Sequence, residues 1–390
     1  MIIKFLTVER NAAVLLLVSA VLGLVAYNTG LAPEIDAARN AHFAIEALHL
    51  DLTLDKWLGE FFIAFFFLLV GLELKREFVS GVFKNRSAIA IPAFAATFGA
   101  IVPAIIYFAM TNGITVGGRS VSAGWALPMA TDVTFAVAVF AVFGAAFAKS
   151  ARTFLLSFAV IDDVIAILVI AIFLGGGLKI EWMLAALASV GLFALVTAQI
   201  PKDVRLGLTR VLRVIYPTLS VVLALAAWYF THESGIAPAV MGVVLGLAVP
   251  ASKLETLAHR LQPWVLLGIL PVFAFFASSV SLGAGLAVTS AMTVAILLRP
   301  IGKMIGINLG VVTAKALVKS DSFSDLRTSD YVRLSILGGI GFTVALLIAG
   351  SVFGTGTPLA NEAVVATLAA MVLSMVLGAI ALATKRKAKN

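Results

Sequence analysis

The sequence contains no cysteine and few charged residues, and each shortage excludes a class of protein. Without cysteine there is no disulfide framework, no thiolate nucleophile and no cysteine-ligated metal. Only 12% of the 390 residues are charged, whereas 61% are hydrophobic and the mean hydropathy is +1.09. Soluble globular domains have about twice that share of charged residues. The composition therefore indicates an integral membrane protein.

The apolar residues come in long runs and not in alternating segments of about ten residues, which favours membrane helices over barrel strands. We expect an all-α polytopic membrane protein in which 1–390 form a single transmembrane transporter domain. The twelve predicted transmembrane helices cover 11–31, 58–74, 90–111, 122–147, 153–175, 182–200, 212–231, 235–250, 263–282, 286–313, 332–354 and 361–384.

The basic residues support this topology. Most of the 28 Lys and Arg residues, Lys303 among them, fall at loops and segment ends that share one side if both termini are cytoplasmic. The net charge of +8 therefore reflects topology and does not indicate a nucleic-acid partner. The four histidines lack ligand spacing, so no metal cofactor or other cofactor is expected.

The longest outside segment, 32–56, contains a short alternation of apolar and polar residues at 48–54. Alternation with period two predicts a strand or hairpin, and a solvated connector is the equally weighted alternative. An exposed hairpin edge would offer a contact between two copies of the chain.

A few ionisable residues lie inside the apolar runs. Each costs at least about 2.5 to 3.5 kcal/mol at the centre of a membrane helix, so each is a functional candidate. Asp162 and Asp163 are adjacent in the fifth stretch, and their side chains point about 100° apart on a helix, so they can serve different partners. The other candidates are Glu60, Glu73, Asp132 and Arg299.

Two spans carry sequence features that interrupt a helix. In the fourth, Pro128 removes a backbone donor shortly before Thr131 and Asp132. In the eleventh, the glycines Gly338, Gly339 and Gly341 permit unwinding, although glycines in membrane helices also serve packing. Interrupted spans at corresponding positions of two halves indicate a transport site between inverted repeats.

The interrupted spans would bring helix ends together in the membrane. Asp132 could offset the positive N-terminal ends, and Arg299 could offset the negative C-terminal ends, pair with Asp162, or snorkel to the interface. Thr131, Asp132 and Asp163 offer the hard oxygen ligands that suit a small alkali cation. Burial also favours the protonated carboxylate, so a proton and a cation would compete for one site.

Four segments resemble the NhaA-type family of bacterial sodium/proton antiporters, in order over nearly the whole chain. They are FLLVGLELKRE (67–77), GWALPMATD (124–132), IDD (161–163) and GIGFT (339–343). The resemblance implies twelve spans, inverted repeats with crossed discontinuous helices, a homodimer, and a multi-pass location in the bacterial inner membrane with roles in sodium and pH homeostasis. It also implies that Asp163, with Asp132 and Thr131, binds sodium or lithium and carries protons, that Asp162 pairs with a basic residue of the tenth span, and that Glu60 and Glu73 line a funnel.

One departure concerns that basic residue. Where the family has lysine in a Gly-Lys-Pro setting, we align Leu298-Arg299-Pro300, and an arginine does not release its proton in the working range. Two alternatives to secondary active antiport stay open, a passive cation channel and an intramembrane aspartyl protease. The preferred function is a transporter, not an enzyme, with sodium, lithium, protons and the lipid bilayer as its partners.

Overall fold

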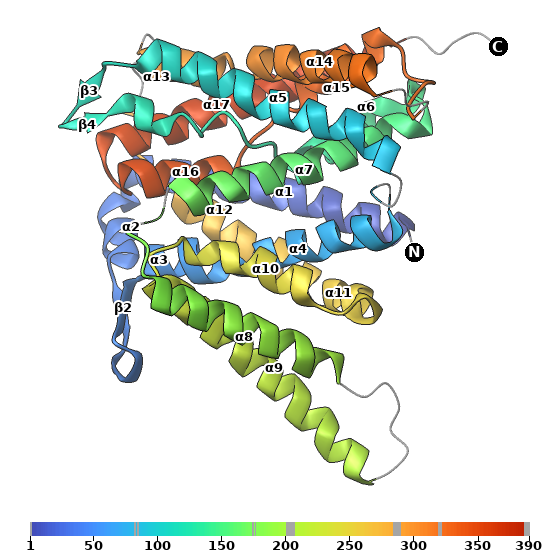
Figure 1. Cartoon of the computed structure of the whole chain (residues 1–390). Helices are drawn as coiled ribbons and strands as arrows, with labels where there is room; N and C mark the ends of the chain where they lie inside the picture. The colour runs from blue at the N-terminus through green and yellow to red at the C-terminus, as the bar shows by residue number, and fades with distance from the viewer. Residues whose placement is uncertain are drawn as a thin grey trace. The chain divides into compact units, whose positions relative to one another are not determined.

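The structure is a computed structural model that describes residues 2–81, 83, 86–173, 175, 177–199, 207–283, 290–318 and 322–385. Positions 174, 200 and 286–289 of the predicted spans lie outside the described residues. The described residues are mostly helical and include two small antiparallel two-stranded sheets (Figure 1). It forms two compact units, unit 1 (Met1–Arg39, Val82–Leu168 and Pro271–Asn390) and unit 2 (Asn40–Gly81 and Val169–Leu270). The single domain expected from the sequence stays a prediction.

Among the described residues, eight helices are long and apolar enough to cross a membrane, and a bent pair of helices makes a ninth candidate. Three shorter apolar helices, Val133–Ala146, Pro238–Ala248 and Thr343–Phe353, fall in the fourth, eighth and eleventh predicted spans. The described residues are therefore mostly helical and consistent with the expected all-α polytopic membrane protein. Twelve as the number of spans stays a prediction.

Unit 1 contains the N-terminal helices, the third to fifth apolar stretches and the last three. Its helices are α1 (Ile2–Ala26), α2 (Ala32–Arg39), α5 (Arg86–Thr111), α6 (Val133–Phe143), most of α7 (Lys149–Phe173) and of α12 (Leu270–Ser278), α13 (Ala291–Leu297), α14 (Arg299–Leu317), α15 (Thr328–Leu337), α16 (Thr343–Phe353) and α17 (Pro358–Ala383). Its strands are β3 (Thr115–Val116) and β4 (Arg119–Ser120).

Glycines bring α14 close to α5, which orients the charged side of α14. A Cβ built on Gly306 would lie 2.3 Å from the Phe98 carbonyl oxygen, and one on Gly310 would lie 2.3 Å from that of Phe94. Small residues permit this approach of two membrane helices. Arg299 and Lys303 are one turn apart on α14, so their side chains leave the helix on a common side.

The predicted tenth span is bent by 49° between α13 and α14, which the sequence analysis did not predict. The break falls at Leu298, just before Arg299 and Pro300. A proline has no backbone N–H and its ring clashes with the carbonyl four residues earlier, so Pro300 accounts for the bend. The bend places Arg299 at the start of α14, in the interior of unit 1.

Unit 2 contains the hairpin and the remaining apolar helices. Its elements are β1 (His42–Ile45), β2 (Leu50–Thr53), α3 (Leu54–Lys56), α4 (Ile63–Ser80), α8 (Ile180–Ala198), α9 (Gly207–Glu233), α10 (Met241–Ala248) and α11 (Leu254–Trp264). The helices α8 and α9 run side by side (Figure 1). Close contacts at Gly71, Gly242 and Gly246 join α4 to α10.

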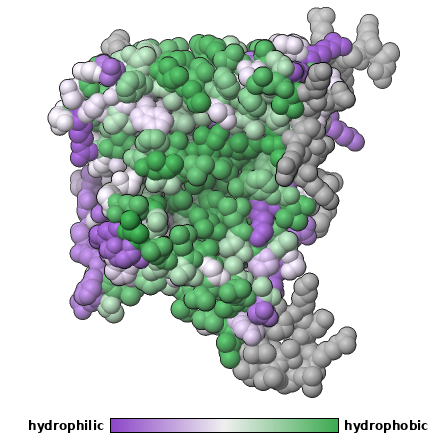
Figure 2. Space-filling view, in the orientation of Figure 1, coloured by the Kyte–Doolittle hydropathy of each residue, from purple (hydrophilic) through white to green (hydrophobic). Residues whose placement is uncertain are grey.

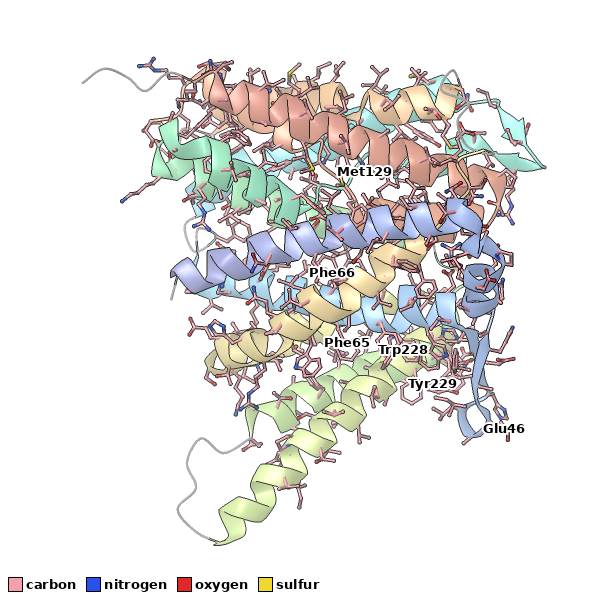
Figure 3. The ribbon with its side chains drawn as sticks, turned by 180° about the vertical axis from the view of Figure 1, so that it is seen from behind. Glu46, Phe65, Phe66, Met129, Trp228 and Tyr229 are labelled. Atoms are coloured by element: carbon pink, nitrogen blue, oxygen red, sulfur yellow. The ribbon has the colours of Figure 1, made fainter. Side chains whose placement is uncertain are left out.

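The hairpin expected near 48–54 is present. Strands β1 and β2 pair antiparallel, with His42 opposite Thr53 and Ile45 opposite Leu50. Figure 3 shows Glu46 at the turn of this hairpin, and Trp228 and Tyr229 of α9 beside its base. Leu50 and Leu52 are buried against Trp228, which anchors the hairpin within unit 2.

The surface is consistent with lipid contact. Figure 2 shows a face covered largely by hydrophobic residues. Exposed leucines line α8, and one of them, Leu195, is 66% exposed. Exposed valines line the described part of α9. Large apolar patches of this kind are rare on soluble monomers and are expected where lipid covers the protein.

Candidate functional site

The fourth predicted span is interrupted where Pro128 stands. A short 3-10 turn at Val121–Gly124 is followed by non-helical backbone, and the helix α6 begins only at Val133. Figure 3 labels Met129 on this unwound segment. Asp132 is the N-cap of α6, and its Oδ1 accepts a hydrogen bond from the Thr134 N–H at 3.1 Å. The sequence correctly predicted a broken helix here.

The eleventh predicted span is interrupted at its glycines. Helix α15 ends at Leu337 and α16 begins at Thr343, with the unwound segment 338–342 between them. A Cβ built on Gly341 would lie 2.3 Å from the Ala130 carbonyl oxygen. Because no side chain fits there, glycine is required where the two unwound segments touch.

The unwound segment 338–342 exposes carbonyl oxygens that a helix would have satisfied. Four of them accept hydrogen bonds from other elements of unit 1. The donors are the Thr131 hydroxyl to Gly338 at 2.7 Å, the Ser374 hydroxyl to Gly339 at 2.9 Å, the Asp132 N–H to Ile340 at 2.7 Å and the Arg299 guanidinium to Gly341 at 2.9 Å. Irregular backbone in a membrane is tolerated only where protein or water satisfies it, and here protein does so.

The Asp132 carboxylate lies at the N-termini of two helices. Besides its contact with α6, its Oδ2 accepts hydrogen bonds from the hydroxyl and, at 3.5 Å, from the N–H of Thr343, the first residue of α16. The N-terminal end of each helix carries a partial positive charge, so one carboxylate stabilises both. This arrangement agrees with the compensating role that the sequence suggested for Asp132.

Asp162 forms a buried ion pair with a lysine that the sequence analysis had assigned to a segment end. The Lys303 Nζ lies 2.7 Å from Oδ1 and 2.8 Å from Oδ2 of Asp162, and neither side chain is accessible to solvent. The predicted pair of Asp162 with Arg299 is therefore wrong. The expectation that the partner of Asp162 cannot release its proton is also wrong, because the ammonium group of a lysine can release one.

A sequence signal for Lys303 was present. Gly302-Lys303 is itself a Gly-Lys dipeptide, four residues after the position that we had aligned with the family's lysine. Pro300 follows Arg299 as the family's proline follows its lysine, and for this reason we aligned Arg299 with that lysine. The Gly-Lys dipeptide was the closer match. Residues four apart lie on the same side of a helix, so periodicity alone could not separate the two candidates.

Arg299 binds backbone and does not snorkel. Its side chain is 1% exposed, and its Nη2 donates to the Gly341 carbonyl oxygen. Among the described residues, its Nε and Nη1 have no hydrogen-bond partner. An ion pair with Asp162 is therefore no longer among the roles proposed for Arg299. The role that remains is to stabilise a carbonyl of the unwound segment.

Asp163 is also buried, with 6% of its surface exposed. Lys303 lies close enough to Asp163 for their charges to interact. Lys303 also interacts with the charges of Asp162 and Arg299. Thr131 is buried beside Asp162. Unit 1 therefore brings together Asp162, Asp163, Lys303 and Arg299, which we call the charged cluster, and Asp132 follows Thr131 in the chain. Within the described residues, no group of three or more His, Asp or Glu side chains is placed to hold a metal ion.

The funnel candidates belong to unit 2. The Oε2 atom of Glu60 lies 3.0 Å from Nδ1 of His232, and the Glu60 backbone carbonyl accepts from the Trp228 indole at 3.0 Å. Glu73 lies partly buried on α4. Their assignment to a funnel stays a prediction.

Comparison with known proteins gives matches over nearly the whole chain. Residues 3–382 match the family model described as Na+/H+ antiporter 1. The Na(+)/H(+) antiporter NhaA 2 of Clavibacter michiganensis is 38% identical over 97% of this chain and 91% of its own length. The Na(+)/H(+) antiporter NhaA 2 of Mycolicibacterium vanbaalenii is 39% identical over 99% of this chain and 85% of its own length. The Na(+)/H(+) antiporter NhaA of Mycolicibacterium smegmatis is 34% identical over 98% of this chain and 87% of its own length.

Proposed function

The chain belongs to the Na+/H+ antiporter 1 family, and on that basis we propose that it is a secondary active transporter that exports sodium or lithium in exchange for protons. It acts as a transporter and not as an enzyme, and it requires no cofactor. The observation that carries the proposal is the meeting of two broken helices at Asp132 and Thr131, beside the buried pair of Asp162 and Lys303.

Competition at one carboxylate would drive the exchange. Asp163, with Asp132 and Thr131, binds either the cation or protons, and the site opens alternately to the two sides of the membrane. A hard oxygen donor set suits a small alkali cation, while burial favours the protonated carboxylate when the cation leaves. Exchange follows because the cation-bound and proton-bound forms exclude each other.

The ion pair would keep Asp162 distinct from Asp163. Lys303 contacts both oxygens of Asp162, which favours an ionised Asp162 over a protonated one. Adjacent residues on a helix point in different directions, so Asp163 can face the cation while Asp162 holds its partner. Arg299 and Asp132 would stabilise the unwound segments on which the site depends.

The remaining family features belong to the same proposal. The chain would form twelve spans with inverted repeats whose two broken helices, the fourth and the eleventh, cross. It would lie in the bacterial inner membrane with both termini cytoplasmic and serve sodium and pH homeostasis. Two copies would form a homodimer through the β1–β2 hairpin, where Phe43 and Ile45 are exposed in the isolated chain.

Purified protein in proteoliposomes tests the proposal. With a proton gradient across the vesicle and a pH dye inside, added sodium or lithium should cause proton movement in the opposite direction to the cation. The measurement is repeated with the membrane potential clamped. Sodium entry without counter-moving protons would indicate a passive channel instead, and no flux of either ion with cleavage of an added membrane peptide would indicate a protease.

A further inference from the structure

Helix α17 packs along α15 at three levels, and the two helices run in opposite directions. The Ser374 Oγ lies 2.9 Å from the Gly339 carbonyl oxygen, which belongs to the unwound segment. A Cβ built on Gly378 would lie 2.6 Å from the side chain of the last residue of α15. In the first turn of α15, the Asp330 Oδ1 lies 2.7 Å from the Nζ of Lys385, two residues after the end of α17. The C-terminal part of the chain therefore contacts α15 from its first turn to the unwound segment.

Asp330 and Lys385 form an ion pair that is largely buried. Their side chains are 5% and 18% exposed. The two oxygens of Asp330 have different partners, because Oδ2 accepts the Arg327 N–H at 3.2 Å and caps α15, while Oδ1 contacts Lys385. The Lys385 backbone N–H donates to the Leu382 carbonyl at 3.2 Å, which fixes the lysine at the end of α17. Water screens such a pair less than it screens an exposed one.

The same ammonium group also contacts the segment that follows α6. The Lys385 Nζ lies over the Phe147 ring, 3.9 Å from the ring centroid, and the face of an aromatic ring attracts a cation. Phe147 comes directly after the 3-10 turn Gly144–Ala146, which continues from the end of α6. Lys385 therefore joins the first turn of α15 to the far end of α6.

Helices α6 and α15 both lead directly to the candidate site. Asp132 is the N-cap of α6, and the unwound segment 338–342 begins where α15 ends. The 11 residues of α6 and the 10 of α15 make helices about 16 Å and about 15 Å long. Rigid helices transmit a restraint from one end to the other. A contact that holds the far ends of both helices thus restrains the two unwound segments.

We propose that Lys385 is a positioning residue for the cation site, because it holds the far ends of α6 and α15 and thereby keeps Thr131, Asp132 and the unwound segment 338–342 in place. This inference rests on the proposed cation exchange. Ligands that are already held in place bind a cation more tightly than ligands that binding must first order. Loss of the contact should therefore weaken sodium binding more than it lowers the maximal rate.

The test changes each partner of the contact in the full-length protein. Lys385→Met removes the ammonium group and keeps most of the aliphatic side chain, whereas Lys385→Arg keeps the charge. Asp330→Asn removes the carboxylate charge but keeps an oxygen that can accept the Arg327 N–H. Phe147→Leu removes the aromatic face and keeps an apolar side chain.

Arg39→Met is the matched control in the same unit. Arg39 is 6% exposed, its Nη1 lies 3.8 Å from the Asp36 Oδ1, and its Cζ lies 5.9 Å from the centroid of the Tyr27 ring. It therefore combines an ion pair with a cation–π contact, as Lys385 does. Both of these contacts are with residues of the N-terminal segment and not with α6 or α15, so their loss tests destabilisation of the unit by itself.

Two measurements report sodium binding independently. Proteoliposomes give the half-saturating sodium concentration and the maximal rate of proton movement. The rise in melting temperature on titration with sodium chloride, with choline chloride at equal ionic strength as the reference, gives equilibrium binding without transport.

We expect Lys385→Met and Asp330→Asn each to raise the sodium concentration needed in both assays by about threefold or more. The double variant should show no further rise, because the two residues act through one contact. Phe147→Leu should give a smaller rise. Lys385→Arg and Arg39→Met should keep the sodium dependence of wild type, although Arg39→Met lowers the melting temperature.

Loss of stability alone would overturn the proposal. If Lys385→Met melts at a lower temperature but keeps the sodium dependence of wild type in both assays, the lysine has only a structural role. An equal rise in the Arg39→Met variant would also contradict positioning by Lys385. Should Lys385→Met not fold, Asp330→Asn must show the expected rise in its place.

Failure of the exchange itself gives a different result. If added sodium moves no protons in wild-type vesicles, the proposed exchange fails, and the melting titration then decides the role of Lys385. Stabilisation of wild type by sodium that Lys385→Met weakens would support the positioning role. Stabilisation that is unchanged in this variant, or absent in wild type, would overturn it.

Discussion

Lys303 and Asp162 form a two-oxygen contact in which Nζ lies 2.7 Å from Oδ1 and 2.8 Å from Oδ2, with both side chains inaccessible to solvent. The pair joins α14 to α7 at the point where two broken helices meet. Because both charges have lost their water, each depends on the other, and the pair is sensitive to the loss of either partner.

Replacing only one member of this pair should destabilise the protein strongly. We expect Lys303→Met to cost about 3 to 5 kcal/mol of unfolding free energy, because it leaves a buried carboxylate unpaired. The double variant Lys303→Met with Asp162→Leu should recover most of that loss. Denaturant unfolding in detergent measures both. The exposed pair of His42 and Asp51 is the control, since His42→Ala should change stability by less than about 1 kcal/mol. Equal losses in the single and double variants would contradict a direct pairing.

Asp163→Asn should abolish sodium-driven proton movement while the protein remains folded. The amide keeps the side-chain size but neither binds a cation as a carboxylate does nor exchanges a proton. Proteoliposome transport and the melting temperature are measured on the same preparation. Exchange that persists in a folded Asp163→Asn variant would refute the site assignment.

Proton and sodium competition predicts a specific pH dependence. A tenfold rise in proton concentration should raise the half-saturating sodium concentration by up to about tenfold, because a protonated carboxylate cannot bind sodium. The maximal rate at saturating sodium should change much less when the pH is varied on the side from which sodium binds. Initial rates over a range of sodium concentrations at several pH values provide the measurement. A half-saturating concentration that is independent of pH would rule out a shared carboxylate.

Gly341→Ala should destabilise the contact between the two unwound segments. A Cβ at this position would lie 2.3 Å from the Ala130 carbonyl oxygen and 2.8 Å from the Arg299 Nη1, and overpacking of this kind costs about 1 to 3 kcal/mol. The matched control is Gly191→Ala in α8, where no heavy atom lies within 4 Å of the added Cβ. That change should leave stability unaltered or raise it by about 0.5 to 1 kcal/mol. Similar melting temperatures for the two variants would show that the close contact is absent.

The hydroxyl of Ser374 should matter more than a typical serine in a membrane helix. Its Oγ lies 2.9 Å from the Gly339 carbonyl oxygen of the unwound segment and 2.7 Å from the Ala370 carbonyl oxygen of its own helix. Ser374→Ala leaves the buried Gly339 carbonyl without this hydroxyl, at a cost of about 1 to 3 kcal/mol. Ser351→Ala is the control, because Ser351 is exposed on α16 and donates only to the Leu347 carbonyl of its own helix. Its change should stay within about 0.5 kcal/mol. Thermal unfolding of the two variants side by side decides whether the carbonyl needs this donor.

Several features followed from the sequence because local chemistry dictates them. Long apolar runs require helices in a bilayer, since only a helix or a closed barrel satisfies every backbone group there. Pro128 and the glycines Gly338, Gly339 and Gly341 weaken their helices wherever they are placed, so both interruptions could be predicted. The period of two at 48–54 predicted a strand or hairpin, with a solvated connector as the alternative, and β2 lies in this segment and pairs with β1.

The partners of the charged residues could not be predicted in the same way. Arg299 and Lys303 occupy equivalent positions one turn apart on α14, and no local rule states which of them reaches Asp162. The bend at Leu298 and the packing of Gly306 and Gly310 against α5 decide the matter, and both depend on residues far away in the chain. The donors for the four carbonyls of the unwound segment come from α14, from α17 and from the fourth predicted span for the same reason.

The sequence by itself determined that this protein is a bundle of membrane helices with acids and two helix breaks in its interior, because hydropathy, proline and glycine act locally. Only the tertiary structure decided that Lys303 neutralises Asp162 and that Arg299 supports Gly341. A buried charge is stabilised by whichever opposite charge or dipole lies within a few ångströms, and those distances are set by the packing of helices and not by their order in the chain.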